Sequence, residues 1–186
     1  NQYSTDGGKT WTAYSKALTF TANGSVIART TDGINTVTAS SQSVTGIDTT
    51  KPTAASFTYT RTSKSITVTA SGTDAESGIT HYQFSKDNGT TWTTIQTGKS
   101  YTFNNLATGS YNIKVKVING TYANVKAVNA NNSLDSTAQS VATVAIAAPT
   151  YSVTNASTWA LSKTVTITYP SGYTNQYSLD SGATWK

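Results

Sequence analysis

The amino-acid sequence predicts an all-β protein that is built from tandem β-sandwich modules. Thr, Ser, Asn, Gly, Ala and Val dominate it, only 11% of its residues are charged, and no segment keeps a helical period. Many short segments alternate apolar and polar residues, which is typical of strands with one face on a core and one in water. One hairpin-like motif occurs three times, and the tryptophans that close it lie 81 and 93 residues apart. That spacing matches one small sandwich module.

Residues 48–147 are predicted to form a complete module. They begin at the polar linker DTTKP, whose Pro52 restricts the backbone and suits a stiff junction. Short strands separated by turn residues favour a sandwich or a barrel. The polar stretch 129–139 is expected to lengthen the last connection of the module. We expect the strands at residues 56–60, 65–70, 79–85, 91–96, 100–103, 110–118, 122–128 and 140–146.

The outer segments are predicted to be two half-modules. Residues 1–47 are predicted to form the C-terminal half of a module, with strands expected at 17–20, 25–29 and 35–38. Residues 148–186 are predicted to form the N-terminal half of another module, with strands expected at 151–154 and 164–169. The sequence NQYS occurs at residues 1–4 and again at 175–178, each time leading into a copy of the motif. The sequence therefore begins and ends near the same point of the module. We therefore expect either a window cut from a longer array or half-modules that neighbouring chains complete by strand donation.

The repeated motif has the frame S-x-D-x-G-x-T-W and resembles the Asp box of sialidases and related β-propellers. An aspartate in a tight turn is expected to accept hydrogen bonds from backbone N–H groups about two residues further on, and the glycine to supply a positive φ. The resemblance implies a structural role that is remote from catalysis. The three copies consist of Ser4, Asp6, Gly8, Thr10 and Trp11; Ser85, Asp87, Gly89, Thr91 and Trp92; and Ser178, Asp180, Gly182, Thr184 and Trp185.

A second resemblance concerns the modules themselves. The sequence LATGSY, which ends at Tyr111, resembles the tyrosine corner of immunoglobulin and fibronectin type III folds. The linker at 47–52, the hairpin at 77–92 and the strand at 23–32 resemble bacterial immunoglobulin-like (fibronectin type III-like) surface-protein repeats. This resemblance implies tandem immunoglobulin-like β-sandwich modules in a secreted or cell-surface protein that is not an enzyme.

The sequence lacks the residues that several kinds of catalysis require. The chain has no cysteine, and therefore no disulfide and no thiol catalysis, and His81, its single histidine, is expected on a sheet surface. A sialidase would need a clamp of three arginines, whereas this chain has only Arg29 and Arg61, and Glu76 is its single glutamate.

No cofactor is expected, with calcium as a weak possibility. Asp48, Asp74 and Glu76 are the densest supply of carboxylates near a module junction and are weak calcium candidates. An isopeptide or ester cross-link would need an acid beside its reacting pair, and the sequence does not identify such a pair. The sequence also has no apolar run long enough to span a membrane.

Neighbouring modules of the same or an adjacent chain are the expected partners. Host or cell-wall glycans are a second expectation, because exposed aromatic side chains stack on sugars and Trp159 has no evident core role. No nucleic acid is expected, because the net charge of +5 is scattered and only Lys114 and Lys116 lie close together.

The sequence favours a non-enzymatic structural repeat segment of a secreted bacterial cell-surface protein, in a stalk, an adhesin or an extracellular fibre. Head-to-tail assembly into a filament is an open extension of this interpretation. Two alternatives remain open, a carbohydrate-binding accessory module of a secreted hydrolase and an immunoglobulin-like domain of a phage tail or capsid.

Overall fold

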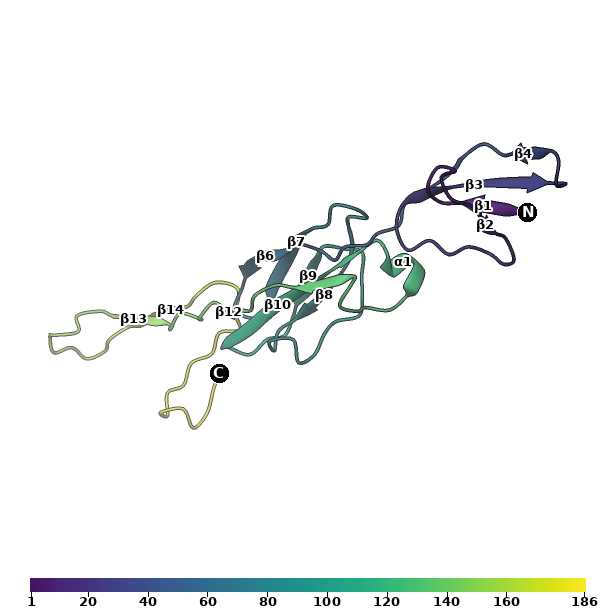
Figure 1. The fold of residues 1–186 in the computed structure, drawn as a ribbon. Helices are drawn as coiled ribbons and strands as arrows, with labels where there is room; N and C mark the ends of the chain where they lie inside the picture. Colours follow the sequence, from purple (N-terminus) through teal and green to yellow (C-terminus); the bar gives the residue numbers. More distant parts are fainter.

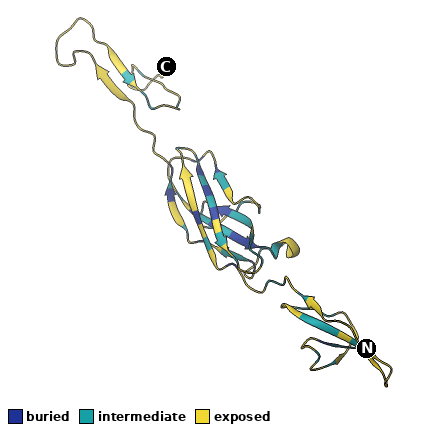
Figure 2. Ribbon diagram, turned by 90° about the horizontal axis from the view of Figure 1, so that it is seen from above, coloured by how far each residue is buried: buried dark blue, intermediate teal, exposed yellow.

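A computed structural model describes all of residues 1–186. Three groups of strands follow one another along an elongated molecule, and the N-terminal and C-terminal groups lie at its opposite ends (Figure 1). Buried residues gather in the middle group, whereas the two outer groups are mostly half-buried or exposed (Figure 2). The all-β fold class is confirmed.

The middle group is a sandwich of two antiparallel sheets. In the first sheet the order is β6-β7-β9, and in the second sheet β8, β11 and β12 all pair with the long strand β10. The strands of the first sheet are β6 (Ala54–Arg61), β7 (Ile66–Thr73) and β9 (Ser100–Phe103). Those of the second sheet are β8 (Ile79–Ser85), β10 (Ser110–Asn119), β11 (Ser133–Asp135) and β12 (Gln139–Ala142).

The hydrophobic core lies between these two sheets. Along β10 the buried Ile113, Val115 and Val117 alternate with the half-buried Lys114 and Lys116, as the sequence alternation predicts. Interdigitation of the two inner faces is what stabilises such a sandwich. The core cluster consists of Phe57, Ile66, Val68, Ala70, Phe84, Phe103, Leu106, Ile113, Val115 and Val141.

The N-terminal group is a single sheet. Its order is β2-β1-β3-β4, and β5 pairs with the other end of β3. No second sheet covers it. Its strands are β1 (Gln2–Ser4), β2 (Thr12–Ala13), β3 (Gly24–Thr31), β4 (Thr36–Thr38) and β5 (Gln42–Val44).

The C-terminal group contains one hairpin, which is formed by β13 (Thr150–Val153) and β14 (Val165–Thr168). The segment SKTVTIT, which contains β14, repeats SKSITVT, which contains the first four residues of β7. This repeat places Val165 and Ile167 at the positions of the buried Ile66 and Val68. The hairpin is therefore a counterpart of the β6–β7 hairpin in the middle sandwich.

Two strand predictions in the middle module are wrong. Residues Tyr122–Val125 form the short helix α1 in place of a strand at 122–128. The buried Asn119 accepts hydrogen bonds from the backbone N–H and the Oγ1 of Thr121 through its Oδ1, which turns the chain away from the sheet. Residues 91–96 form only an isolated bridge, between Tyr82 and Gln96.

Other strand boundaries depend on which partner strand is present. Residues 17–20 (ALTF) repeat the pattern of β9 (SYTF) but form no strand, because β9 pairs with β7 and the N-terminal sheet has no counterpart of β7. The strand expected at 140–146 ends at Ala142. The polar stretch 129–139 is not only a connection, because it contains β11, which pairs with β10.

Candidate functional site

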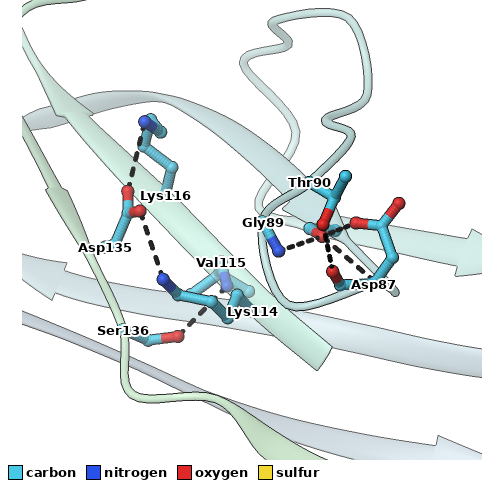
Figure 3. A network of polar contacts seen from close by, with 9 residues as sticks. Asp87, Gly89, Thr90, Lys114, Val115, Lys116, Asp135 and Ser136 are labelled. Atoms are coloured by element: carbon cyan, nitrogen blue, oxygen red, sulfur yellow. Dashed lines mark hydrogen bonds and ion pairs between the residues drawn. The ribbon is translucent and has the colours of Figure 1, made fainter. Parts of the chain in front are cut away.

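Each copy of the repeated motif is a turn that is closed by its own side chains. In the middle copy, Ser85 Oγ accepts a hydrogen bond from the Gly89 N–H at 2.8 Å and donates one to Asp87 Oδ1 at 2.7 Å. Asp87 in turn accepts hydrogen bonds from the backbone N–H of Thr91, at 2.9 Å, and from its hydroxyl. Ser85 is buried at the end of β8, so the network anchors the turn to the sheet. Figure 3 shows Asp87 and Gly89 of this turn.

The same bonds close the other two copies. The serine hydroxyl is 2.8 Å from the glycine nitrogen in both, and the aspartate accepts from the backbone N–H and the hydroxyl of the threonine four residues on. The glycines have φ values of +89°, +86° and +92°, in the region that favours glycine. The other two networks are formed by Ser4, Asp6, Gly8 and Thr10, and by Ser178, Asp180, Gly182 and Thr184.

The expected mechanism of the turn needs one correction. The aspartate accepts no hydrogen bond from the N–H two residues on, and reaches instead the threonine four residues on. The serine hydroxyl caps the turn by accepting the hydrogen bond of the glycine N–H. The repeated sequence frame includes this serine, but the predicted hydrogen-bonding scheme gave it no role. In the middle copy a Cβ added at Gly89 would lie 3.2 Å from the Trp92 ring, so the closing tryptophan packs directly on the glycine.

These hydrogen bonds stabilise the ionised form of each aspartate. The hydroxyl and then the backbone N–H of Thr91 lower the pKa of Asp87 to about 2, and bonds from Ser178 and Thr184 do the same for the pKa of Asp180. The hydroxyl of Thr10 is the main cause of a pKa of Asp6 well below its usual range. Each carboxylate therefore stays ionised and accepts the hydrogen bonds that close its own turn.

A pH dependence follows for the middle module. A carboxylate with a lowered pKa in the folded state stabilises the fold above its unfolded pKa, about 4 for aspartate, and this contribution is lost as the pH falls toward the folded value. We expect Asp87→Asn to lower the urea midpoint at pH 7, and the difference from wild type to shrink between about pH 4 and pH 2. Asp180→Asn, which lies in the C-terminal group outside the middle module, is the matched control and should leave the urea midpoint of the middle module unchanged. A pH-independent difference would contradict this assignment.

A cation stacks on the tryptophan of two copies. Arg29 Cζ lies 4.0 Å from the centre of the Trp11 ring, and Lys116 Nζ lies 4.7 Å from that of Trp92. The two cations sit at equivalent register positions, opposite Gln2 on β1 and Gln83 on β8. The motif itself does not indicate this contact, because the cation lies on a neighbouring strand.

The paired lysines of β10 have partners within the module. Lys114 Nζ lies 3.4 Å and Lys116 Nζ 3.2 Å from the carboxylate of Asp135 on β11 (Figure 3). They therefore form an ion-pair cluster across two neighbouring strands.

Tyr111 lies at the start of β10. Its hydroxyl donates a hydrogen bond to the carbonyl of Ala107, four residues upstream, at 3.1 Å, and its ring packs against the core cluster. This is the bond that defines a tyrosine corner.

The three calcium candidates lie near one another, but N–H and O–H donors hold their oxygens. Asn119 Nδ2 donates to Asp48 Oδ2 at 2.8 Å and to Asp74 Oδ2 at 3.2 Å, and the hydroxyl of Ser77 donates to Asp48. Glu76 accepts from the backbone N–H groups of Thr49 and Thr50. No group of three or more acidic, histidine or cysteine side chains is arranged to hold a metal ion.

This network is the junction between the N-terminal sheet and the sandwich. The fully buried Asn119 also donates to the carbonyl of Thr50, so its amide joins the linker to the Asp74 loop and to the end of β10. The backbone N–H of Thr49 is the main cause of a lowered pKa of Glu76. The carboxylates therefore fasten the linker to the module.

His81 and Trp159 lie in different surroundings. His81 is half-buried on β8, its ring centre is 4.7 Å from that of Tyr122, and its Nδ1 is 2.9 Å from Thr80 Oγ1. Trp159 is fully exposed on the turn between β13 and β14.

An apolar groove of about 800 Å³ crosses the uncovered face of the N-terminal sheet. Fourteen residues line it, ten of them hydrophobic. Its lining includes side chains from β1, β3, β4, β5 and the 14–20 segment. The apolar lining includes Tyr3, Leu18, Phe20, Val26, Ala28 and Val44.

Comparisons with known proteins find the repeated motif, and over the whole chain they find only distant similarity. The family model of the BNR/Asp-box repeat matches residues 2–13, which contain the first copy. A solved structure of the fibronectin(III)-like modules of Clostridium thermocellum CbhA is similar over 69% of this chain, with 15% identity and a TM-score of 0.36. The chain spans half the length of that structure. No curated protein is similar enough to count as a relative.

Proposed function

We propose that the chain is a non-enzymatic structural segment of a secreted bacterial surface protein, in a stalk, an adhesin or an extracellular fibre. The observation that carries this proposal is the elongated succession of strand groups, with the two outer groups at opposite ends (Figures 1 and 2). The motif residues support it, because their hydrogen-bonding groups serve their own turns. The one helix, α1, is too short to cross a membrane.

Contacts at both junctions support a spacer that resists bending. On the N-terminal side Pro52 is fully buried, and Asn119 holds the carbonyl of Thr50. On the C-terminal side the hydroxyl of Tyr173 donates to Ser63 Oγ, in the turn between β6 and β7, at 3.2 Å. Such contacts limit the rotation of neighbouring groups, which an array that projects from a cell requires.

Small-angle X-ray scattering of dilute protein tests this arrangement. A compact globule of this length would have a radius of gyration of about 16 Å, and an unfolded chain about 46 Å. We expect a folded, rod-like particle with a value clearly between the two. A value at the compact limit would contradict a spacer.

One observation favours a second candidate, a carbohydrate-binding accessory module. Trp159 is fully exposed and Tyr151 is 71% exposed on the C-terminal hairpin, where aromatic rings could stack on sugars. A glycan array distinguishes the two candidates, because specific binding that Trp159→Ala abolishes would support this second function, and no binding would leave the structural role.

A further inference from the structure

The junction between the linker and the middle sandwich contains a chemically labile pair of residues. Asn119, the last residue of β10, is followed by Gly120, and the structure requires both. Asn119 is fully buried, and its amide joins the linker to the sandwich. A Cβ added at Gly120 would lie 2.9 Å from the carbonyl oxygen of Ser77, closer than a side chain can approach, so only glycine fits.

An asparagine that precedes a glycine is prone to deamidation, because glycine has no side chain to hinder its nitrogen. In this reaction the backbone nitrogen of Gly120 would form a bond to Cγ of Asn119. The side-chain nitrogen of Asn119 would leave as ammonia and take up the proton that the Gly120 nitrogen loses. Water would then open the resulting succinimide ring to aspartate or isoaspartate. Either product carries a carboxylate in place of the amide.

The folded junction keeps both reacting groups from this step. The Gly120 N–H donates to Ser77 Oγ at 2.9 Å, which fixes the attacking nitrogen. The Asn119 amide makes hydrogen bonds at both of its polar atoms, and its Cγ cannot rotate toward the Gly120 nitrogen while they persist. The partners are Asp48 Oδ2, the Thr50 carbonyl and Asp74 Oδ2 for Nδ2, and the N–H and Oγ1 of Thr121 for Oδ1.

Two other asparagine–glycine pairs occur in the chain, and both are held less tightly. Residues 88–89 lie exposed in the middle motif turn, where the glycine N–H donates to Ser85 Oγ at 2.8 Å but the Asn88 side chain has no hydrogen-bond partner. Asn23 is exposed as well, and its side chain accepts a single backbone hydrogen bond, at 2.9 Å. Folding therefore buries and fixes the asparagine of only one pair, the one at the junction.

We propose that Asn119–Gly120 is a deamidation site that the docked linker protects and that becomes reactive when the linker detaches. Asp48 and Thr50, two of the partners of the Asn119 amide, belong to the linker, so detachment removes both. Glu76 holds the same linker by accepting hydrogen bonds from the backbone N–H groups of Thr49, at 2.6 Å, and Thr50, at 3.0 Å. Glu76 makes no hydrogen bond to Asn119, so it affects this site only through the linker.

Deamidation would make the detachment permanent. The new carboxylate would face those of Asp48 and Asp74 in a buried position, where like charges repel and are poorly solvated. Isoaspartate would also lengthen the backbone next to Gly120, where Ser77 leaves no space. The junction would thus pass once, and irreversibly, from fastened to loose. This consequence for stiffness rests on the proposed spacer function, whereas the reaction itself does not.

Peptide mapping by mass spectrometry tests the site on the full chain, incubated at mildly alkaline pH either folded or unfolded in urea. Asn119 and Asn88 are both followed by Gly-Thr, so they should deamidate at similar rates in the unfolded chain. In the folded chain we expect Asn119 to react at least about a hundredfold more slowly, because opening must break several hydrogen bonds together. An equal rate in the folded and unfolded chains, or no reaction at Asn119 in the unfolded chain, would overturn the proposal.

Glu76→Gln distinguishes detachment of the linker from unfolding of the sandwich. It removes the charge that holds the linker and leaves Asn119–Gly120 intact. We expect it to raise the rate at Asn119 at least about threefold and to leave the rate at Asn88 unchanged. Asp135→Asn, a matched acid-to-amide change in the ion-pair cluster, should alter neither rate.

Equal conversion of Asn119 in wild type and Glu76→Gln, including none in either, would overturn the protective role of the linker. That result would leave the spacer function standing, because the radius of gyration tests that function separately.

Discussion

Phe84→Ala is expected to lower the thermal stability of the middle sandwich strongly. Phe84 is fully buried, and its ring stacks on Tyr101 with the centroids 5.7 Å apart. Removing a buried phenylalanine side chain costs about 3–5 kcal/mol, a large part of the 5–15 kcal/mol that stabilises a typical domain. We expect the thermal midpoint, followed by near-ultraviolet circular dichroism in dilute solution, to fall by at least about 12 °C.

The repeat provides the matched control for this substitution. Tyr3 takes the same place before the first motif but is only half-buried in the uncovered sheet. Tyr3→Ala should therefore leave the midpoint of the middle sandwich unchanged. Equal losses for the two variants would contradict the view that only the middle group has a closed core.

Asn119→Asp is expected to be the second most damaging change, although it alters a single group of atoms. The substitution replaces the amide that donates to Asp48 and Asp74 with a carboxylate beside two others, in a fully buried position. An uncompensated buried charge and the lost donors should together cost about 3 kcal/mol or more. The cost should be smaller in acid, where the new carboxyl group is protonated.

Urea unfolding at pH 7 measures this effect, and Asn112→Asp on the same strand is its control. Asn112 is exposed, so its substitution should change the free energy of unfolding by no more than about 0.5 kcal/mol. A small effect at both positions would mean that the linker is not fastened through Asn119.

The strands that the sequence predicted well have both a local pattern and a partner. Residues 100–103 match β9 and residues 79–85 match β8, because their alternation agrees with a core that exists in the chain. Residues 17–20 have the same local pattern as β9 and form no strand. The difference lies in the missing partner, which no local window of sequence contains.

The candidate site was predictable to the same extent. The repeated frame indicated the turns and the positive φ of Gly89, because both depend on neighbours within a few residues. The stacking of Arg29 on Trp11 and the contacts of Asn119 join residues that lie far apart in the sequence. They follow from strand register, which becomes known only when the sheets are assembled.

The mechanical role is tested most directly by stretching single molecules of the chain between their two ends. The closed middle sandwich should resist until it unfolds in one step, which releases residues 54–142, or about 300 Å of extended chain less the folded span. One force peak with that gain in length is the predicted result. Smooth extension without a peak would show that no part of the chain bears load, and would contradict a structural spacer.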